Sequence, residues 1–236
     1  MTEPTTHTVG QPAEGEQPDG HDPVPEALDW LLGILTAVIG LGVTAVGIGI
    51  YTQIDRATIE DAVTAEGVQL EGLTPAEAIT AGDPFVNWFA AGLIVTGLGL
   101  LAGGAVFVAL RRRTRRRVNR TGGTTATFWA CTVYGAAVTM LLSFIPGSSL
   151  LGGGAAGYLY GDDEIRVGAA AALVGGAATV PLTLFLAAGL IAGASAIGEF
   201  TGGVLVAALL LIGELLALTI TAALGATGGY LSDRLR

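Results

Sequence analysis

The chain has 236 residues, of which 51% are hydrophobic and 13% are charged. Soluble domains usually carry about 25% charged residues, so this composition excludes an ordinary soluble fold. Apolar runs of 20 or more residues recur and predict a membrane protein with several spans. Once these runs are set aside, too little polar chain remains for a catalytic domain, and we expect no enzyme.

The charge pattern is acidic and lacks lysine. Twenty acidic residues against eleven basic ones give a formal net charge of −9, and every basic residue is an arginine. Such a surface suits a salt-loaded cytoplasm, because carboxylates hold water and cations well. By compositional analogy, we expect the chain to come from a halophilic archaeon.

The first residues, 1–27, form an acidic tail that is rich in Pro, Gly and Glu and is expected to be disordered. The two histidines, His7 and His21, lie in this tail. A zinc site needs about four ligands, and neither histidine has such partners nearby. We therefore expect no metal site.

Residues 28–110 are expected to form a transmembrane hairpin of two spans, 28–51 and 85–110. Glycines recur at seven-residue intervals in both spans, which places each set on one helix face. Small residues on one face let two helices approach closely in lipid, so the matching stripes predict antiparallel packing. The glycines are Gly33, Gly40 and Gly47, Gly42 and Gly49, Gly92 and Gly99, and Gly97 and Gly104.

The loop between these spans, residues 52–84, carries seven acidic residues and is expected outside the cell. Within it, Thr74 and Glu77 form a capping box with a proline directly after the cap. A short helix should follow and end near Gly82 and Pro84.

Residues 111–122 form an arginine-rich linker that holds seven of the eleven basic residues. Arginine and lysine concentrate in short cytoplasmic loops, so we expect the linker and both termini in the cytoplasm. Anionic lipid headgroups are a candidate partner, whereas nucleic acid is not expected because no aromatic residues interleave the arginines. The candidate lipid contacts are Arg111, Arg112, Arg113, Arg115, Arg116 and Arg117.

Residues 123–236 form a Gly/Ala-rich domain in which we expect four membrane helices. A third span covers about 125–145, a short apolar segment covers 147–160, and the last span covers about 203–230. Between them, an acidic turn leads into an apolar stretch to about residue 190. Two prolines are candidate breaks or hinges, namely Pro146 and Pro181.

The segment 147–160 decides the topology. Its fourteen residues extend about 21 Å as a helix, which is less than the roughly 30 Å of a bilayer core. If it crosses, there are six spans, and Arg166, Arg234 and Arg236 lie inside with the linker. If it is re-entrant, there are five spans and those arginines lie outside. The arginine bias favours six spans.

Two glycine-rich motifs suggest a tandem repeat. Residues 151–159 are echoed by residues 224–231, and both copies contain Gly-Tyr-Leu. The repeat predicts two helical hairpins, 125–161 and 165–231, with both Gly-Tyr-Leu ends on one side. Chance similarity is the alternative in so biased a composition.

Several of these motifs occur together in one known family. They are Ile145-Pro146, the glycine-rich run into Ala156-Gly157-Tyr158-Leu159, the acidic turn, Arg166-Val167-Gly168-Ala169 and the closing segment 225–231. Over about residues 123–236, the chain resembles a haloarchaeal family of integral membrane proteins of unknown activity. The resemblance implies a small multi-span protein and supplies no catalytic residues.

Glu214 lies near the middle of the last span. A carboxylate at that depth costs about 2.5–3.5 kcal/mol, so it should face a partner or a water-filled cavity. It is either an ion or proton site, or a protonated or hydrogen-bonded residue that locks helices together. Cys131 is expected to be a small packing residue. No phosphate loop or dinucleotide fingerprint is present, and no cofactor is expected.

The sequence therefore favours a non-catalytic membrane protein that works by packing, oligomerisation or partner binding in the bilayer. The alternative is a small transporter or channel that uses Glu214, Pro181 and the break at 146–149, because interrupted helices and buried ionisable groups are typical of transport sites. The bilayer and a second copy of the chain are the expected partners, with a small solute or ion only for a transporter.

Overall fold

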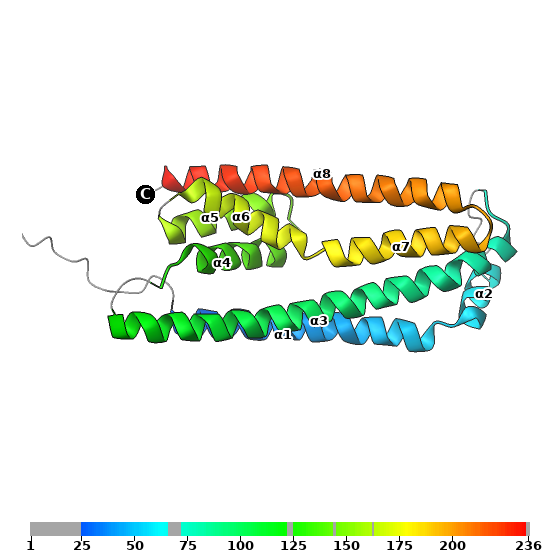
Figure 1. Ribbon diagram of the computed structural model, residues 1–236, viewed down its shortest axis with the longest axis horizontal. Helices are drawn as coiled ribbons and strands as arrows, with labels where there is room; N and C mark the ends of the chain where they lie inside the picture. The colour runs from blue at the N-terminus through cyan, green and yellow to red at the C-terminus, as the bar shows by residue number, and fades with distance from the viewer. Residues whose placement is uncertain (1–24, 66–71, 122–124, 144, 162, 235–236) are drawn as a thin grey trace, which may run out of the picture.

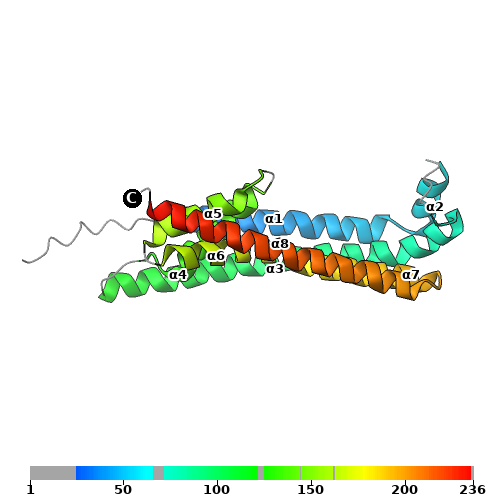
Figure 2. The ribbon, with the colours of Figure 1, turned by 90° about the horizontal axis from the view of Figure 1, so that it is seen from above.

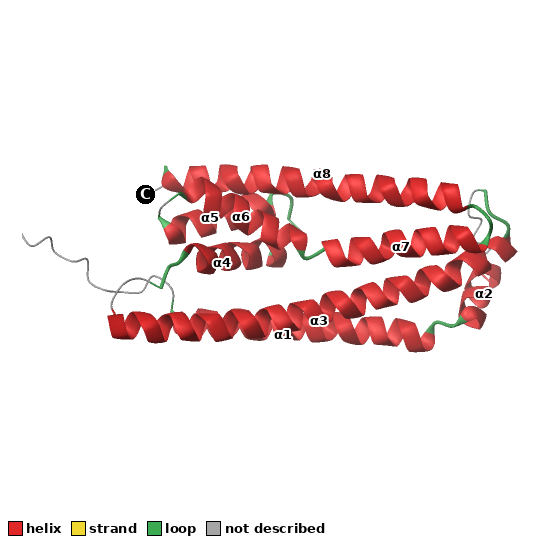
Figure 3. Ribbon diagram, in the orientation of Figure 1, coloured by secondary structure: helices red, strands yellow, loops and turns green. Residues whose placement is uncertain are grey.

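The computed structural model describes residues 25–65, 72–121, 125–143, 145–161 and 163–234. Within these residues it contains eight helices and no strand (Figure 3), which confirms the all-α class. The tail expected to be disordered lies almost entirely outside the described residues. The helices are α1 (Glu26–Gln53), α2 (Arg56–Ala65), α3 (Pro75–Thr121), α4 (Phe128–Leu141), α5 (Ser148–Tyr160), α6 (Glu164–Ala177), α7 (Val180–Ala196) and α8 (Phe200–Asp233).

The helices form an elongated bundle (Figures 1 and 2). α1, α3 and α8 run along its length, and α6 and α7 follow one another in line, whereas α4 and α5 lie at the end where α3 and α8 terminate. Four segments are long and apolar enough to cross a membrane, which indicates a membrane protein. They are Glu26–Gln53, Pro75–Thr121, Glu164–Ala196 and Phe200–Asp233.

α1 and α3 pack antiparallel through the predicted glycine stripes. Gly33 lies opposite Gly104, and a Cβ added at Gly40 would lie 2.7 Å from the carbonyl oxygen of Gly97. Residue numbers rise along α1 while they fall along α3, and the backbones approach too closely for side chains between them. α1 and α3 therefore pack antiparallel, as the glycine spacing predicts.

The remaining glycines of the predicted stripes do not make this contact. Gly42, Gly49 and Gly99 face open space. A Cβ at Gly92 would lie 2.6 Å from the Cβ of Phe185 in α7. One stripe of each helix therefore forms the hairpin, and Gly92 instead brings α3 against the C-terminal half of the chain.

α3 is one helix of 47 residues, about 70 Å long. The capping box is confirmed, because the Thr74 N–H donates to Glu77 Oε2 at 2.8 Å and the Glu77 N–H donates to Thr74 Oγ1 at 3.3 Å. The expectation that the helix ends near Gly82 and Pro84 is wrong. An interior proline removes one backbone hydrogen bond, and the packing of α3 on both α1 and α7 outweighs that loss. The arginine-rich segment continues the same helix to Thr121.

α4 and α5 are short helices of 14 and 13 residues. They extend about 21 and 20 Å, so neither alone crosses a core of roughly 30 Å. The turn between them lies near the middle of the long axis of the bundle rather than at its far end (Figure 1). The expected six spans are therefore not confirmed.

The stretch after the acidic turn is divided into two helices, with Ala178 and Thr179 between α6 and α7. Pro181 lies in the first turn of α7, where its missing N–H has no intrahelical partner to lose. The carbonyl of Ala177, four residues earlier, has no proline N–H to accept from, and α6 ends at that residue. Pro181 thus lies directly after a break between two helices.

α5 and α8 pack parallel to each other along their glycine-rich ends. A Cβ at Gly153 would overlap the backbone of Gly225, and one at Gly157 would lie 3.0 Å from the Cα of Gly229. Residue numbers rise together along the two helices. Both Gly-Tyr-Leu ends therefore lie at the same end of the bundle, as the repeat predicts.

Candidate functional site

A buried carboxylate lies at the end of the bundle where α3 terminates. Asp29, in the first turn of α1, is 4% exposed. Its Oδ1 accepts a hydrogen bond from Arg111 Nε at 2.8 Å, and its Oδ2 accepts one from Arg115 Nε at 2.7 Å. The hydroxyl of Tyr134, from α4, also donates to Oδ1. We name these four residues the Asp29 clasp.

The Asp29 clasp joins the N-terminal hairpin to the C-terminal half of the chain. Arg111 Nη1 donates to the carbonyl oxygen of Thr125 at 2.6 Å, and the guanidinium carbon lies 5.8 Å from the centre of the Tyr134 ring. That ring also meets Phe107 of α3 edge to face, with centroids 5.9 Å apart. Residues of α1, α3 and α4 are thereby held together by ionic, hydrogen-bonding and aromatic contacts.

The clasp contains one carboxylate and two guanidinium groups, so its formal charge is +1. Arg111 is only 4% exposed, and its Nη2 atom has no hydrogen-bond partner among the described residues. An ion pair at such burial stabilises the fold only if both charges remain, because removal of one partner leaves the other uncompensated. Substitution of Asp29 or Arg111 is therefore expected to destabilise the packing of α1 against α3.

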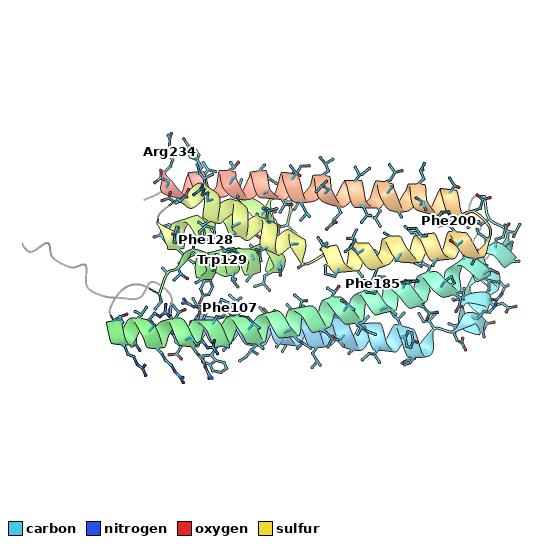
Figure 4. The ribbon with its side chains drawn as sticks, viewed as in Figure 1. Phe107, Phe128, Trp129, Phe185, Phe200 and Arg234 are labelled. Atoms are coloured by element: carbon cyan, nitrogen blue, oxygen red, sulfur yellow. The ribbon has the colours of Figure 1, made fainter. Side chains whose placement is uncertain are left out.

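Other arginines of α3 point away from the bundle. The Arg112 guanidinium lies 4.4 Å from the ring centre of Trp30, a cation–π contact on the outer face. Figure 4 shows long nitrogen-tipped side chains projecting from this end of α3, on the side away from α4. They border two concavities of about 410 and 340 Å³, the first lined by Glu26, Arg112, Arg115, Arg116 and Asn119 and the second by Arg113, Arg116, Arg117, Arg120 and Thr121.

Of the six arginines predicted to contact lipid, the structure thus places two elsewhere. Arg111 is buried in the clasp. Arg115 pairs with Asp29 and also lines the first concavity. Arg112, Arg113, Arg116 and Arg117 remain exposed.

An apolar crevice of about 220 Å³ separates the two halves below the clasp. α1 and α3 line one wall and α4 and α6 the other, and the lining residues include Ile39, Leu100 and Leu141. No lining residue of this crevice is ionisable. The halves meet again beyond it, where Trp88 of α3 packs on Phe185 of α7 with ring centroids 5.7 Å apart.

Glu214 contacts the break between α6 and α7. Thr179 Oγ1 lies 2.7 Å from Glu214 Oε1, and Pro181 follows two residues after that threonine. The sequence alone does not identify this partner of Glu214. Pro146 is exposed in the turn between α4 and α5. Cys131 is fully buried among small and apolar residues of α4, α5 and α6.

Among the described residues, no three His, Cys, Asp or Glu side chains lie close enough together to hold a metal ion. Residues 129–235 match the model of a family of unknown function, DUF5518. The match extends over nearly all of α4 and the whole of α5 to α8, and it leaves out α1, α3 and three of the four clasp residues. No curated protein and no solved structure matches the chain.

Proposed function

We propose that the chain is a non-catalytic, multi-pass protein of the cell membrane whose arginine end binds anionic lipid headgroups at the cytoplasmic face. The observation that carries this proposal is the exposed set of arginines on the last turns of α3, which border two concavities while the clasp holds the helix in place. The Trp30 ring beneath Arg112 supports an interfacial position, because tryptophan is enriched at headgroup level.

The acidic, lysine-free composition supports a halophilic source, which bears on how such lipids would be held. The Debye length is about 3 Å at 1 M salt, so long-range attraction is screened. Binding must then rely on direct contact, and guanidinium groups provide it through paired hydrogen bonds to phosphate oxygens.

Lipid retention tests this proposal. Detergent-purified protein is mixed with phosphatidylglycerol or phosphatidylcholine, and bound lipid is counted by native mass spectrometry. The double variant Arg112→Gln/Arg116→Gln should lose phosphatidylglycerol selectively, since each arginine near an anionic surface contributes about 1 kcal/mol, or about fivefold in affinity. Arg56→Gln, in α2 at the far end, should retain it. Equal retention of both lipids by the unmodified chain would refute the proposal.

We further propose that the arginine end faces the cytoplasm, with both termini there. The first turn of α6, which contains Arg166, and Arg234 after α8 lie at the same end of the bundle as the end of α3 (Figures 1 and 4), which supports this orientation. Four crossings by α1, α3, α6–α7 and α8 satisfy the arginine bias without a fifth or sixth span. In this topology α4 and α5 enter from the cytoplasmic side and turn back halfway.

Cysteine accessibility distinguishes the four-crossing topology from six spans. In a Cys131→Ala background, an impermeant maleimide should label Asp55→Cys in intact cells and Arg166→Cys only after permeabilisation. Ser143→Cys, in the α4–α5 turn, should be labelled from neither side. Labelling of Ser143→Cys from outside would establish six spans, and labelling of Arg166→Cys in intact cells would reverse the orientation.

A second copy of the chain is the further partner that we propose. In the four-crossing topology the exposed turn around Pro146 lies in the hydrocarbon region, where irregular backbone is tolerated only against protein or water. A neighbouring copy would cover it. Disulfide cross-linking of Ser143→Cys between copies in native membranes tests this, with exposed Thr52→Cys as the control.

The alternative function is transport of an ion or proton, favoured by the contact between Glu214 and the broken helix at Thr179. Flux of protons or sodium into vesicles containing the protein should then fall in Glu214→Gln. Equal flux through both proteins would remove Glu214 from any transport mechanism.

A further inference from the structure

Glu214 lies in the middle of α8, opposite the break in the neighbouring helix pair. It follows Phe200 by 14 residues and precedes Asp233 by 19, which places it about 21 Å from one end of the helix and about 28 Å from the other. Its side chain is half-buried, and its Oε1 atom lies 2.7 Å from the hydroxyl oxygen of Thr179.

The Thr179 hydroxyl has two oxygen neighbours at the same short distance. The carbonyl oxygen of Gly176 lies 2.7 Å from Oγ1, and Glu214 Oε1 also lies 2.7 Å away. A hydroxyl carries one proton, and a carbonyl oxygen can only accept. When the threonine proton is donated to Gly176, the contact with Glu214 is a hydrogen bond only if the carboxyl group carries a proton, because an ionised carboxylate can only accept.

Other threonines show the pattern of a single shared proton. Thr52 Oγ1 lies 2.9 Å from one carbonyl oxygen and 3.3 Å from another, and the values for Thr64 are 2.7 and 3.3 Å. Thr58 has neighbours at 2.7 and 3.5 Å. In each case one bond is short and the second contact is long, whereas both contacts of Thr179 are short.

The surroundings of Glu214 offer no charge to balance an ionised carboxylate. The helices packed on α8 are α5, α6 and α7, and α7 has no ionisable side chain. Arg166 in α6 precedes Thr179 by 13 residues, about 20 Å along the helix. The other ionisable side chains of these helices also lie near helix ends, namely Tyr158, Tyr160, Glu164, Tyr230 and Asp233.

An ionised carboxylate in the middle of a membrane helix is costly, and a bound proton removes that charge.

We propose that Glu214 is a proton-binding site in the middle of the bundle, and that its bound proton joins α8 to the α6–α7 break by donation to the Thr179 hydroxyl. Loss of that proton leaves two acceptor oxygens facing each other and removes the bond. This site is independent of lipid binding at the arginine end.

Infrared spectroscopy of the full chain in phosphatidylcholine vesicles tests the proposal, with glutamate labelled by ¹³C at the side-chain carboxyl carbon. The unmodified chain at pH 7 should show a protonated carboxyl C=O band that shifts in D₂O, and Glu214→Gln should lack it. Thr179→Val should keep the band at a shifted frequency, because the acid has lost its acceptor. Glu199→Gln, which removes an exposed glutamate, should leave it unchanged.

Absence of a protonated glutamate band from the unmodified chain at pH 7 would show that Glu214 is ionised and would overturn the proposal, whatever the folding of the variants. The same conclusion follows if the band survives in Glu214→Gln with native helicity by circular dichroism. A band unaltered by Thr179→Val would show that the acid is not bonded to that threonine and would overturn the proposed link between α8 and the break.

Discussion

Asp29 and Arg111 are 82 residues apart in the chain, yet Arg111 Nε donates to Asp29 Oδ1 at 2.8 Å with both side chains almost fully buried. The pair joins the first turn of α1 to α3, at the point where the apolar part of α3 gives way to its arginine turns. A charged group is thus neutralised where each helix leaves its apolar stretch, and the hairpin is fixed by polar contacts at one end and glycine contacts along its length.

Replacement of Asp29 by asparagine should destabilise the chain strongly. Removal of one partner from a buried ion pair typically costs about 3–5 kcal/mol, because the other charge remains without compensation. The midpoint of thermal unfolding in detergent, followed by circular dichroism, should fall. Glu26→Gln removes an exposed charge three residues earlier and should change the midpoint little. Equal midpoints for Asp29→Asn and the unmodified chain would contradict the role of the clasp.

Tyr134→Phe should weaken the clasp while it preserves the ring contact with Phe107. A hydrogen bond to a charged group contributes about 1.5–3 kcal/mol, and the phenylalanine lacks only the hydroxyl. The double variant with Asp29→Ala should cost less than the sum of the two single changes, since Tyr134→Phe and Asp29→Ala both remove the same bond. Strict additivity in this thermodynamic cycle would mean that the tyrosine hydroxyl and the carboxylate do not interact.

Gly97→Ala and Gly99→Ala should differ although they are two residues apart in one helix. A Cβ at Gly97 would lie 2.6 Å from the carbonyl oxygen of Gly40, whereas one at Gly99 meets nothing within 4 Å. The first change should cost about 1–3 kcal/mol through overpacking, and the second should be neutral or stabilising, because alanine favours helix. Comparison of their unfolding midpoints checks this, and indistinguishable values would place the hairpin contact on another face.

Acidification should loosen the start of α2. The Thr58 N–H and hydroxyl both donate to Asp55 Oδ1, at 2.9 and 2.7 Å, and these bonds hold the pKa of Asp55 below its usual value. A depressed folded-state pKa contributes stability above the unfolded value of about 3.9. That stability is lost as the pH falls from there through the lower folded-state pKa.

Hydrogen exchange over residues 54–65 measures this effect. Protection of the Thr58 amide should fall below about pH 4 once intrinsic exchange rates are taken into account. Asp55→Asn, which keeps a capping oxygen but does not titrate, should remove the pH dependence. A pH dependence that persists in that variant would assign the effect to another carboxyl group.

The glycine hairpin was predictable because a seven-residue spacing alone places Gly33, Gly40, Gly97 and Gly104 on single faces. Spacing did not reveal that Gly42, Gly49 and Gly99 would face outward, since that depends on which stripe finds a partner. The break at Pro181 could be located because its cause is local. The continuity of α3 through Pro84 could not, because tertiary packing decides whether an interior proline ends a helix.

The Asp29 clasp could not be derived from the sequence, because no rule pairs Asp29 with Arg111 and Arg115 across more than 80 residues. One signal was present. Asp29 lies one residue inside the predicted first span, and an ionisable residue at such a position needs a partner. From the sequence, the arginine run was interpreted mainly as a signal of membrane topology. That interpretation did not distinguish one arginine from another. Only the structure separates the buried pair from the outward set.

The edge of the DUF5518 match passes through the middle of the clasp. Tyr134 lies inside the matched segment, 129–235. Asp29, whose carboxylate accepts the hydrogen bond from the Tyr134 hydroxyl, lies far outside it. The family segment is thus not self-sufficient in this chain. A chimera of this segment with a different N-terminal hairpin would need a hydrogen-bond acceptor at the position of Asp29, within reach of the Tyr134 hydroxyl. The hydrogen bond from Tyr134 to Asp29 is one of the contacts that cross this boundary.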